Sequence, residues 1–196
     1  MNAKCLLFVL LPVACMAQTR PDLYRCEGCE AVRERDFATL TSSAIIASPD
    51  EPGERLVLTG RVFKPDGRTL ASGVVIYAHH TNAEGVYPSH PGDTGWARRH
   101  GYLRGWVITD QSGTYRFETI RPAPYRTRTD PAHIHMFVKE PDRPEYWIDD
   151  VLFTDDPLVT DAVRKHQQQR GGSGIVTPRR NEAGVWIVQR DIILER

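Results

Sequence analysis

Alternation of apolar and polar side chains marks several short stretches of this chain as β-strands. Over 114–120, the apolar Tyr115 and Phe117 alternate with the polar Arg116 and Glu118. A strand sends successive side chains to opposite faces, so this pattern predicts one buried and one solvated face. Similar stretches predict further strands over 56–63, 74–80, 106–109, 133–138, 146–153, 175–177 and 185–194.

Turn residues between these stretches predict how the strands connect. Lys64-Pro65-Asp66-Gly67 places Pro and Gly where a tight turn needs them, so we expect 74–80 to pair with 56–63. A Gly-containing turn at 181–184 is expected to join the last two strands. Many short strands with regular turn signals predict an all-β fold, an antiparallel β-sandwich.

Helical signals are few. Residues 161–169 predict one short helix that ends before Gly171-Gly172. Residues 18–50 predict an irregular, polar N-terminal arm, with a second short helix around 31–41. Residues 81–102 are rich in Gly and Pro and predict one long loop, a length at which loops are usually functional.

The first 17 residues predict a cleaved secretory signal peptide: Lys4 is followed by an apolar run over 5–11 and small residues up to Ala17. The apolar run is too short to span a membrane. Because Pro12 stands where a lipoprotein signal has an aliphatic residue, simple secretion or periplasmic export is favoured over a lipid anchor at Cys15. The expected organisation is a signal peptide at 1–17, an arm at 18–50 and one domain at 51–196.

Two cysteines, Cys26 and Cys29, remain after the signal peptide and form a CxxC pair. Such a pair can be redox-active, half of a zinc site or a local disulfide. The sequence has no second CxxC and no βαβ pattern around this one, so in an oxidising compartment we expect a structural disulfide.

The composition limits the classes of partner. The chain has 196 residues, enough for one well-packed domain. Lys plus Arg and Asp plus Glu both total 25, and this balance gives no electrostatic signature of binding to nucleic acid or an anionic membrane. An edge-rich sandwich with an N-terminal arm leaves a homodimer open.

Candidate chemistry centres on the segment Pro131-Ala132-His133-Ile134-His135. Residues i and i+2 of a strand share a face, so both imidazoles are expected to point into one space, as half of a metal site requires. Upstream, Tyr87 follows Gly85 in the long loop, and Tyr125 follows two prolines. Each residue also has a structural interpretation: the histidines could lie on a solvated face, and the tyrosines could be ordinary packing residues.

Sequence fragments around these residues occur in a consistent order over about 59–157. They are Gly60-Arg61-Val62, Ala83-Glu84-Gly85-Val86-Tyr87, Arg104-Gly105-Trp106, Thr109-Asp110-Gln111-Ser112-Gly113, Arg121-Pro122-Ala123-Pro124-Tyr125 and Pro131-Ala132-His133-Ile134-His135. In this order the fragments resemble the intradiol ring-cleavage dioxygenases, the family of catechol and protocatechuate dioxygenases.

This resemblance implies a mononuclear non-haem Fe(III) site without an organic cofactor. Its ligands would be Tyr87, Tyr125, His133 and His135, with Tyr125 acting in turn as ligand and base. Phenolate favours ferric over ferrous iron, and two phenolates with a hydroxide would balance the 3+ charge. The implied reaction cleaves a catechol between its hydroxylated carbons with O2 and gives a muconate-type dicarboxylate.

Asp130 is the main departure from the family pattern, because family members usually carry an arginine just before Pro-Ala-His-Ile-His. Arg126 and Arg128, in the connecting loop, are our candidate catalytic residues for supplying that charge. Only eight positions separate Tyr125 from His133, a short spacing for the family that predicts a more open pocket.

Other interpretations compete with ring cleavage. A catalytically silent sandwich that binds a partner is favoured by Asp130, whereas a zinc or ferrous enzyme is disfavoured by the two tyrosines. Asp150 loosely aligns with a glutamine common in the family. The histidines without a motif partner are expected to be structural or exposed, with His90 or His100 as candidates to line the pocket; they are His79, His80, His90, His100 and His166.

Overall fold

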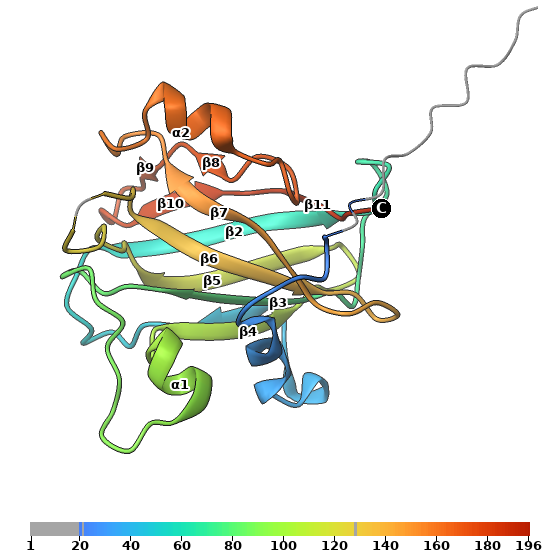
Figure 1. The fold of residues 1–196 in the computed structure, drawn as a ribbon, viewed down its shortest axis with the longest axis horizontal. Helices are drawn as coiled ribbons and strands as arrows, with labels where there is room; N and C mark the ends of the chain where they lie inside the picture. The colour runs from blue at the N-terminus through green and yellow to red at the C-terminus, as the bar shows by residue number, and fades with distance from the viewer. Residues whose placement is uncertain (1–19, 21, 128) are drawn as a thin grey trace, which may run out of the picture.

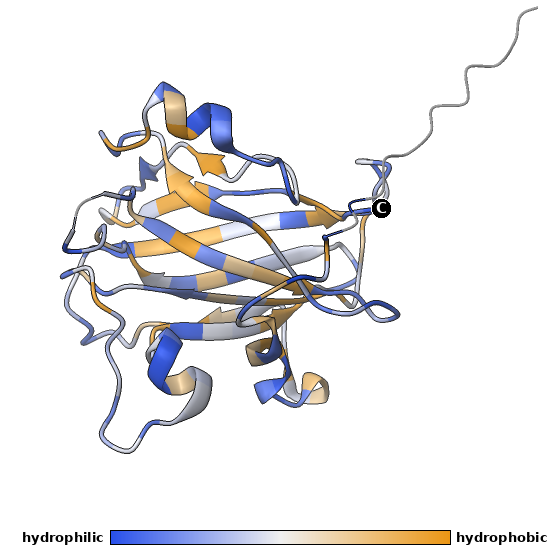
Figure 2. Ribbon diagram, viewed as in Figure 1, coloured by the Kyte–Doolittle hydropathy of each residue, from blue (hydrophilic) through white to orange (hydrophobic). Residues whose placement is uncertain are grey.

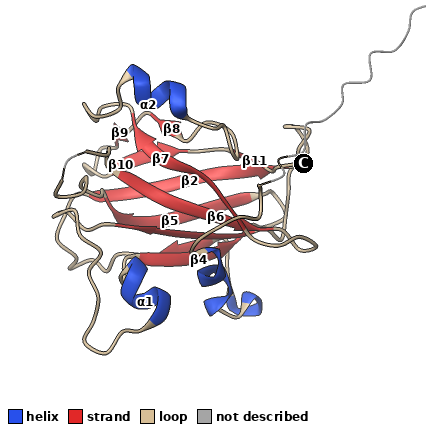
Figure 3. Ribbon diagram, viewed as in Figure 1, coloured by secondary structure: helices blue, strands red, loops and turns tan. Residues whose placement is uncertain are grey.

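Two β-sheets face each other in the computed structural model of this protein, which describes residues 20, 22–127 and 129–196 (Figure 1). The expected signal peptide at 1–17 and Arg128 lie outside the described residues. Strands dominate the elements and the few helices lie at the periphery (Figure 3). The predicted β-sandwich is therefore confirmed.

The first sheet has the strand order β1-β5-β2-β10-β9, with β11 also paired to β2. Its strands are β1 (Ser43–Ile45), β2 (Arg55–Phe63), β5 (Thr114–Ile120), β9 (Arg179–Arg180), β10 (Trp186–Gln189) and β11 (Ile192–Ile193). β2 pairs antiparallel with β5, whereas β10 and β11 run parallel to β2 and β1 runs parallel to β5. This sheet is thus mixed rather than purely antiparallel.

The second sheet has the order β4-β3-β6-β7-β8 and carries the candidate histidines. Its strands are β3 (Val75–His80), β4 (Arg104–Ile108), β6 (His133–Lys139), β7 (Tyr146–Phe153) and β8 (Ile175–Val176). All neighbours pair antiparallel except β7 and β8, which are parallel.

Alternation along the strands divides the second sheet into two apolar faces. Its inner face, with Ile76 and Ile134, packs against Leu58 and Phe117 of the first sheet in the main core. Figure 2 shows the alternation as orange and blue bands along the strands. This burial away from water is the main favourable contribution to folding.

The outer face of the second sheet is covered by the N-terminal arm. Tyr77 and Phe137 point to this face and pack with Cys29 and Val32 of the arm. The arm forms the short 3₁₀ helices η1 (Cys29–Glu34) and η2 (Phe37–Thr39), and the expected disulfide joins Cys26 to Cys29. By the same alternation, His133 and His135 also belong to this outer face.

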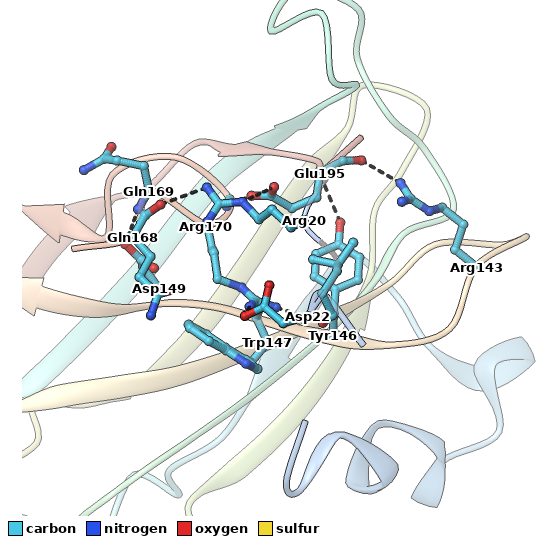
Figure 4. Close-up of polar contacts among 12 residues, drawn as sticks. Arg20, Asp22, Arg143, Tyr146, Trp147, Asp149, Gln168, Gln169, Arg170 and Glu195 are labelled. Atoms are coloured by element: carbon cyan, nitrogen blue, oxygen red, sulfur yellow. Dashed lines mark hydrogen bonds and ion pairs between the residues drawn. The ribbon is translucent and has the colours of Figure 1, made fainter. Parts of the chain in front are cut away.

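A polar cluster fixes the start of the arm to the end of the chain (Figure 4). Arg170, which is 1% exposed, lies over the Trp147 ring and donates to the Leu23 carbonyl at 2.9 Å. Arg20 forms an ion pair with Glu195 at 2.8 Å. The arm is therefore held at both the disulfide end and the chain terminus.

The predicted pairing of 74–80 with 56–63 is wrong. β3 lies in the second sheet between β4 and β6, while β2 pairs with β5 in the first. Instead of a hairpin, the Lys64 N–H donates to the Thr69 carbonyl in a local turn. The Val74 N–H, just before β3, then donates to the hydroxyl of Thr109, just after β4 of the second sheet. Alternation identifies strands, but the partner across a longer connection depends on tertiary packing.

Three smaller predictions also need correction. The 81–102 segment contains a helix, α1 (Gly95–His100). The helix α2 (Asp161–His166) ends early, because the Asp149 carboxylate accepts the Gln169 backbone N–H at 2.8 Å.

The predicted strand 185–194 is interrupted between β10 and β11. There the Asp191 carboxylate takes the Arg61 N–H at 3.0 Å in place of a backbone carbonyl. The turn at 181–184 connects β10 to β9, while β8 belongs to the second sheet.

Candidate metal centre

Four side chains from three segments bring their donor atoms together at one point. Tyr87 comes from the loop after β3, Tyr125 from the segment after β5, and His133 and His135 from β6. The two tyrosine Oη atoms are 2.7 Å apart, and the two histidine Nε2 atoms are 3.1 Å apart. Tyr87 Oη lies 2.9 Å from His135 Nε2, and Tyr125 Oη lies 3.1 and 3.4 Å from the two imidazoles.

Hydrogen bonds at the far side of each imidazole determine which nitrogen faces this cluster. His133 Nδ1 lies 2.7 Å from the Pro131 carbonyl, and His135 Nδ1 lies 3.0 Å from the Asp150 carboxylate. Both partners are acceptors, so each Nδ1 must carry a proton. In the neutral rings the two Nε2 lone pairs therefore point toward each other.

The donor set fits a bound cation. If each tyrosine donates its proton to one imidazole, no proton remains between the two phenol oxygens or between the two Nε2 atoms. A metal ion at the centre would satisfy all four donors at once. Donors bound at about 2 Å to one first-row metal ion lie roughly 2.8–3.3 Å apart, close to the separations found here.

A β-bulge places Asp150 behind His135. Ile134 pairs with Val151 and Met136 with Ile148, so the two aspartates of β7, Asp149 and Asp150, oppose the single residue His135. Bulges re-aim side chains in this way beside functional sites. A carboxylate on the distal nitrogen orients a metal-binding histidine and raises its basicity.

Hydrogen bonds between the segment after β3 and the segment after β5 position the two tyrosines. Ala123 N–H donates to the Asn82 carbonyl at 3.1 Å, and the Thr81 hydroxyl donates to the Ala123 carbonyl at 2.7 Å. Gly85 has a φ of +74°, and a Cβ there would lie 2.1 Å from the Pro124 carbonyl oxygen. Only glycine permits this approach, which brings Tyr87 to Tyr125.

Burial controls the protonation of the cluster. It raises the pKa of Tyr87, and the hydrogen bond with Tyr125 raises it further. Burial also raises the pKa of Tyr125, with smaller upward contributions from the Asp150 and Asp130 carboxylates, although Tyr87 opposes it. Burial lowers the pKa of His133. At neutral pH without a cation, the tyrosines are therefore neutral and His133 is an unprotonated donor.

Asp150 itself is held as a carboxylate. Burial would raise its pKa, but the adjacent His135 and, more distantly, His133 and Arg190 lower it below the ordinary value. Together with two phenolates, this carboxylate would give the site an anionic donor environment suited to a highly charged cation.

Three hollows meet at His135 and form one groove over the cluster. One, of about 460 Å³, is lined by Tyr87, Trp96 and His100, and another, of about 600 Å³, by Asp130 and Val163. A third of about 400 Å³ extends beside Trp147. The groove thus runs from α1 past the donor cluster to α2. The two helices lie on different sides of the molecule in Figure 1.

No described contact joins the candidate catalytic arginines to the four candidate metal-binding side chains. Arg126 lies 3.6 Å from Glu84 with 70% of its side chain exposed, and it is not among the described residues that line the groove. Arg128 is outside the described residues. The proposed role of these arginines therefore stays a prediction.

Sequence reasoning missed the place of His79 in this site. His79 is buried between His100 and His135, and its Nδ1 has no hydrogen-bond partner among the described residues. His100 lines the groove, as one of two expected candidates, whereas His90 lies against Tyr102. The sequence did hold a signal for His79: as residue i+2 from Tyr77 on β3, it shares the face of the sheet that Tyr77 occupies.

The fold and the donor cluster define a β-sandwich that joins two tyrosines and two histidines at one point. The family model described as Dioxygenase matches residues 34–184, which is more than half of the chain. The protein therefore belongs to the intradiol ring-cleavage dioxygenase family.

Individual relatives are similar over part of their length. Catechol 1,2-dioxygenase 1 of Acinetobacter lwoffii is 38% identical over 112 residues, which cover 49% of this chain and 35% of that protein. A chlorocatechol 1,2-dioxygenase of Pseudomonas putida is 27% identical over 165 residues, covering 72% of this chain and 56% of that protein. The chain thus spans about a third to just over half of these relatives.

Solved structures share the fold. The dioxygenase domain of a dioxygenase carbohydrate-binding protein fusion from Streptomyces sp. SirexAA-E has a TM-score of 0.60 and 21% identity, covering 80% of this chain and 88% of that one. Catechol 1,2-dioxygenase from Acinetobacter sp. ADP1 has a TM-score of 0.62 and 22% identity, covering 80% and 57%. At these identities the likeness supports the architecture alone.

Proposed function

We propose that this protein is an Fe(III)-dependent intradiol dioxygenase that cleaves a catechol between its two hydroxylated carbons. One carbon–carbon bond breaks, and both atoms of O2 enter the product, a muconate-type dicarboxylate. The catechol is oxidised and O2 is reduced, so no further reductant is required. The observation that carries the proposal is the cluster of Tyr87, Tyr125, His133 and His135, with both Nε2 lone pairs facing one centre.

Ferric iron, when bound, would supply a Lewis-acidic centre that holds a catecholate for reaction with O2. The residues of this chain provide the proton chemistry. Burial raises the pKa of Tyr125, so its phenolate, once it leaves the metal, would be a strong base for the proton of a substrate hydroxyl. Asp150 accepts a hydrogen bond from the Nδ1–H of His135. This contact keeps the proton on Nδ1 and fixes the orientation of the ring.

The first test is the visible spectrum of the iron-loaded protein. Tyrosinate–Fe(III) charge transfer should colour it red-brown, and Tyr87→Phe and Tyr125→Phe should each shift or weaken the band. Removal of iron with a chelator should bleach the protein, and Fe(III) but not Zn(II) should restore the colour. A colourless protein with stoichiometric iron, or an unchanged band in both variants, would refute the assignment.

The second test is oxygen uptake with a panel of catechols and mass analysis of the product. The expected product is the intradiol acid containing both oxygen atoms of O2. Extradiol products would contradict the proposal.

Asp130 favours a second candidate, a silent module that retains the site without turnover. Its carboxylate lines the groove beside Tyr125 and His133, where the family usually has a cation. A red-brown protein that binds catechols but consumes no O2 with any of them would support this alternative.

We also propose that the protein is exported and acts on a small molecule, either as a monomer or as a homodimer. The Cys26–Cys29 disulfide supports an oxidising compartment. Among the described residues, the helices are too short and too polar to cross a membrane.

A further inference from the structure

The disulfide loop of the arm forms one wall of the groove. Arg99 of α1 donates to the Glu27 carboxylate at 2.6 Å, which ties the Cys26–Cys29 loop to the helix. Gly28 packs so closely that a Cβ there would lie 3.0 Å from the His100 imidazole and 3.5 Å from the Trp96 ring. The arm and α1 therefore build this wall together, beside Tyr87, Tyr125 and His135 of the donor cluster.

Flat side chains form a continuous series along this wall toward the candidate metal ligands. The Arg99 guanidinium lies over Trp96, whose ring centroid is 4.8 Å from that of His100. His100 and His79 are stacked 3.8 Å apart and almost parallel, and His79 is 4.7 Å from His135. The series thus leads from the surface at α1 to a member of the donor cluster.

The other end of the groove has a different character. There the 600 Å³ hollow is lined by Asp130, Leu152, Ala162, Val163 and His166, with the carboxylate of Asp150 below. Trp96 and His100 of α1 line the 460 Å³ hollow, Phe137 lines that hollow and the 400 Å³ one, and none of these three lines the 600 Å³ hollow. Hollows of this size fit drug-sized molecules, so a single dihydroxylated ring would leave much of either one unfilled.

We infer that the preferred substrate is a catechol that carries a second aromatic ring, and that this second ring lies against the wall of Trp96, His100 and Phe137. The inference rests on the proposed ring-cleaving function, because it assumes that the catechol end lies at the donor cluster. Aromatic rings gain from edge-to-face or offset contacts beyond the gain from burying their area. A flat substituent should therefore be preferred over a saturated one of similar size.

The test compares 4-phenylcatechol with 4-cyclohexylcatechol on the iron-loaded full chain. Dissociation constants are measured without O2 from the change in the visible band, and kcat/KM is measured with O2. We expect the phenyl compound to be favoured by about 2- to 12-fold in both measurements, the range that one aromatic contact provides. Trp96→Leu should bring the preference close to unity, while Trp96→Phe should retain most of it.

Trp186→Leu serves as the matched control, because Trp186 lies on β10 in the first sheet, outside the groove. It should keep the wild-type preference. A wild-type preference near unity, or one that Trp96→Leu does not change, would overturn the inference. If none of the catechols, including the unsubstituted one, is cleaved, the proposed function fails, and the binding ratio alone still decides whether the wall selects a flat ring.

Discussion

At the scale of single residues, Asp150 offers the sharpest test of the donor cluster. Its carboxylate accepts a hydrogen bond from the Nδ1–H of His135 at 3.0 Å and adds negative charge behind that imidazole. Loss of such a partner typically lowers metal affinity 10- to 100-fold. We expect Asp150→Asn, which keeps an acceptor oxygen, to weaken Fe(III) binding by about 10-fold, and Asp150→Ala to weaken it by about 100-fold, as measured by competition with a calibrated chelator.

Asp130→Asn is the control for this experiment. It also removes a carboxylate from the groove, but that carboxylate has no described contact with His135. Fe(III) affinity should stay within about threefold of the wild type, because only the direct partner orients the ligand ring. Equal losses in Asp130→Asn and Asp150→Asn would indicate a general charge effect and would contradict the positioning role.

The same residues show what the sequence could predict of the site. Tyr87, Tyr125, His133 and His135 occur in recognisable fragments, and the structure brings all four together. Asp150 aligned only loosely with the family, and its place behind His135 depends on a bulge that the sequence pattern does not show. Arg126 was chosen by its nearness in sequence, which does not determine side-chain direction in a loop.

At the scale of elements, the loop between β3 and α1 determines whether Tyr87 reaches the cluster. Gly85→Ala would place a methyl group 2.1 Å from the Pro124 carbonyl oxygen at a φ of +74°. Strain and overpacking together should lower the free energy of unfolding by roughly 3 kcal/mol and reduce iron loading. Urea unfolding and the intensity of the tyrosinate band measure the two effects.

Gly92→Ala is the control that separates backbone strain from the steric clash expected in Gly85→Ala. Gly92 has a similar φ of +90°, but a Cβ there would meet no atom within 4 Å. This variant should lose only about 1 kcal/mol and keep its full iron content. Similar losses in the two variants would mean that the contact between Gly85 and Pro124 does not position Tyr87.

Strand positions were largely predictable at this scale, and strand partners were not. The alternation at 114–120 reflects burial of one face and agrees with β5. The partner of β3 depended instead on the path of the chain over 64–73, which crosses from one sheet to the other. The helix α1 lacks a long apolar periodicity, because it is six residues long and lines the groove with Trp96, Arg99 and His100.

At the scale of the whole molecule, His80 connects the two sheets through a buried hydrogen bond. It lies on β3, is fully buried, and its Nε2 is 2.6 Å from the hydroxyl of Thr119 on β5. Its Nδ1 lies 2.7 Å from the Thr81 carbonyl, so Nδ1 carries the proton and Nε2 accepts from Thr119. The contact therefore requires the neutral imidazole.

Burial of the His80 imidazole makes the stability of the sandwich depend on pH. Burial lowers the pKa of His80 to about 4, so between pH 6.5 and 4 the unfolded chain binds more protons than the folded one. Stability from the neutral ring is thus complete above pH 6.5 and lost as pH falls toward 4, amounting to roughly 3 kcal/mol. Urea unfolding of the metal-free protein should show His80→Gln with a correspondingly shallower decline over this range. The exposed His90 provides the control: His90→Gln should follow the wild type, and a wild-type decline in His80→Gln would show that other groups cause the acid sensitivity.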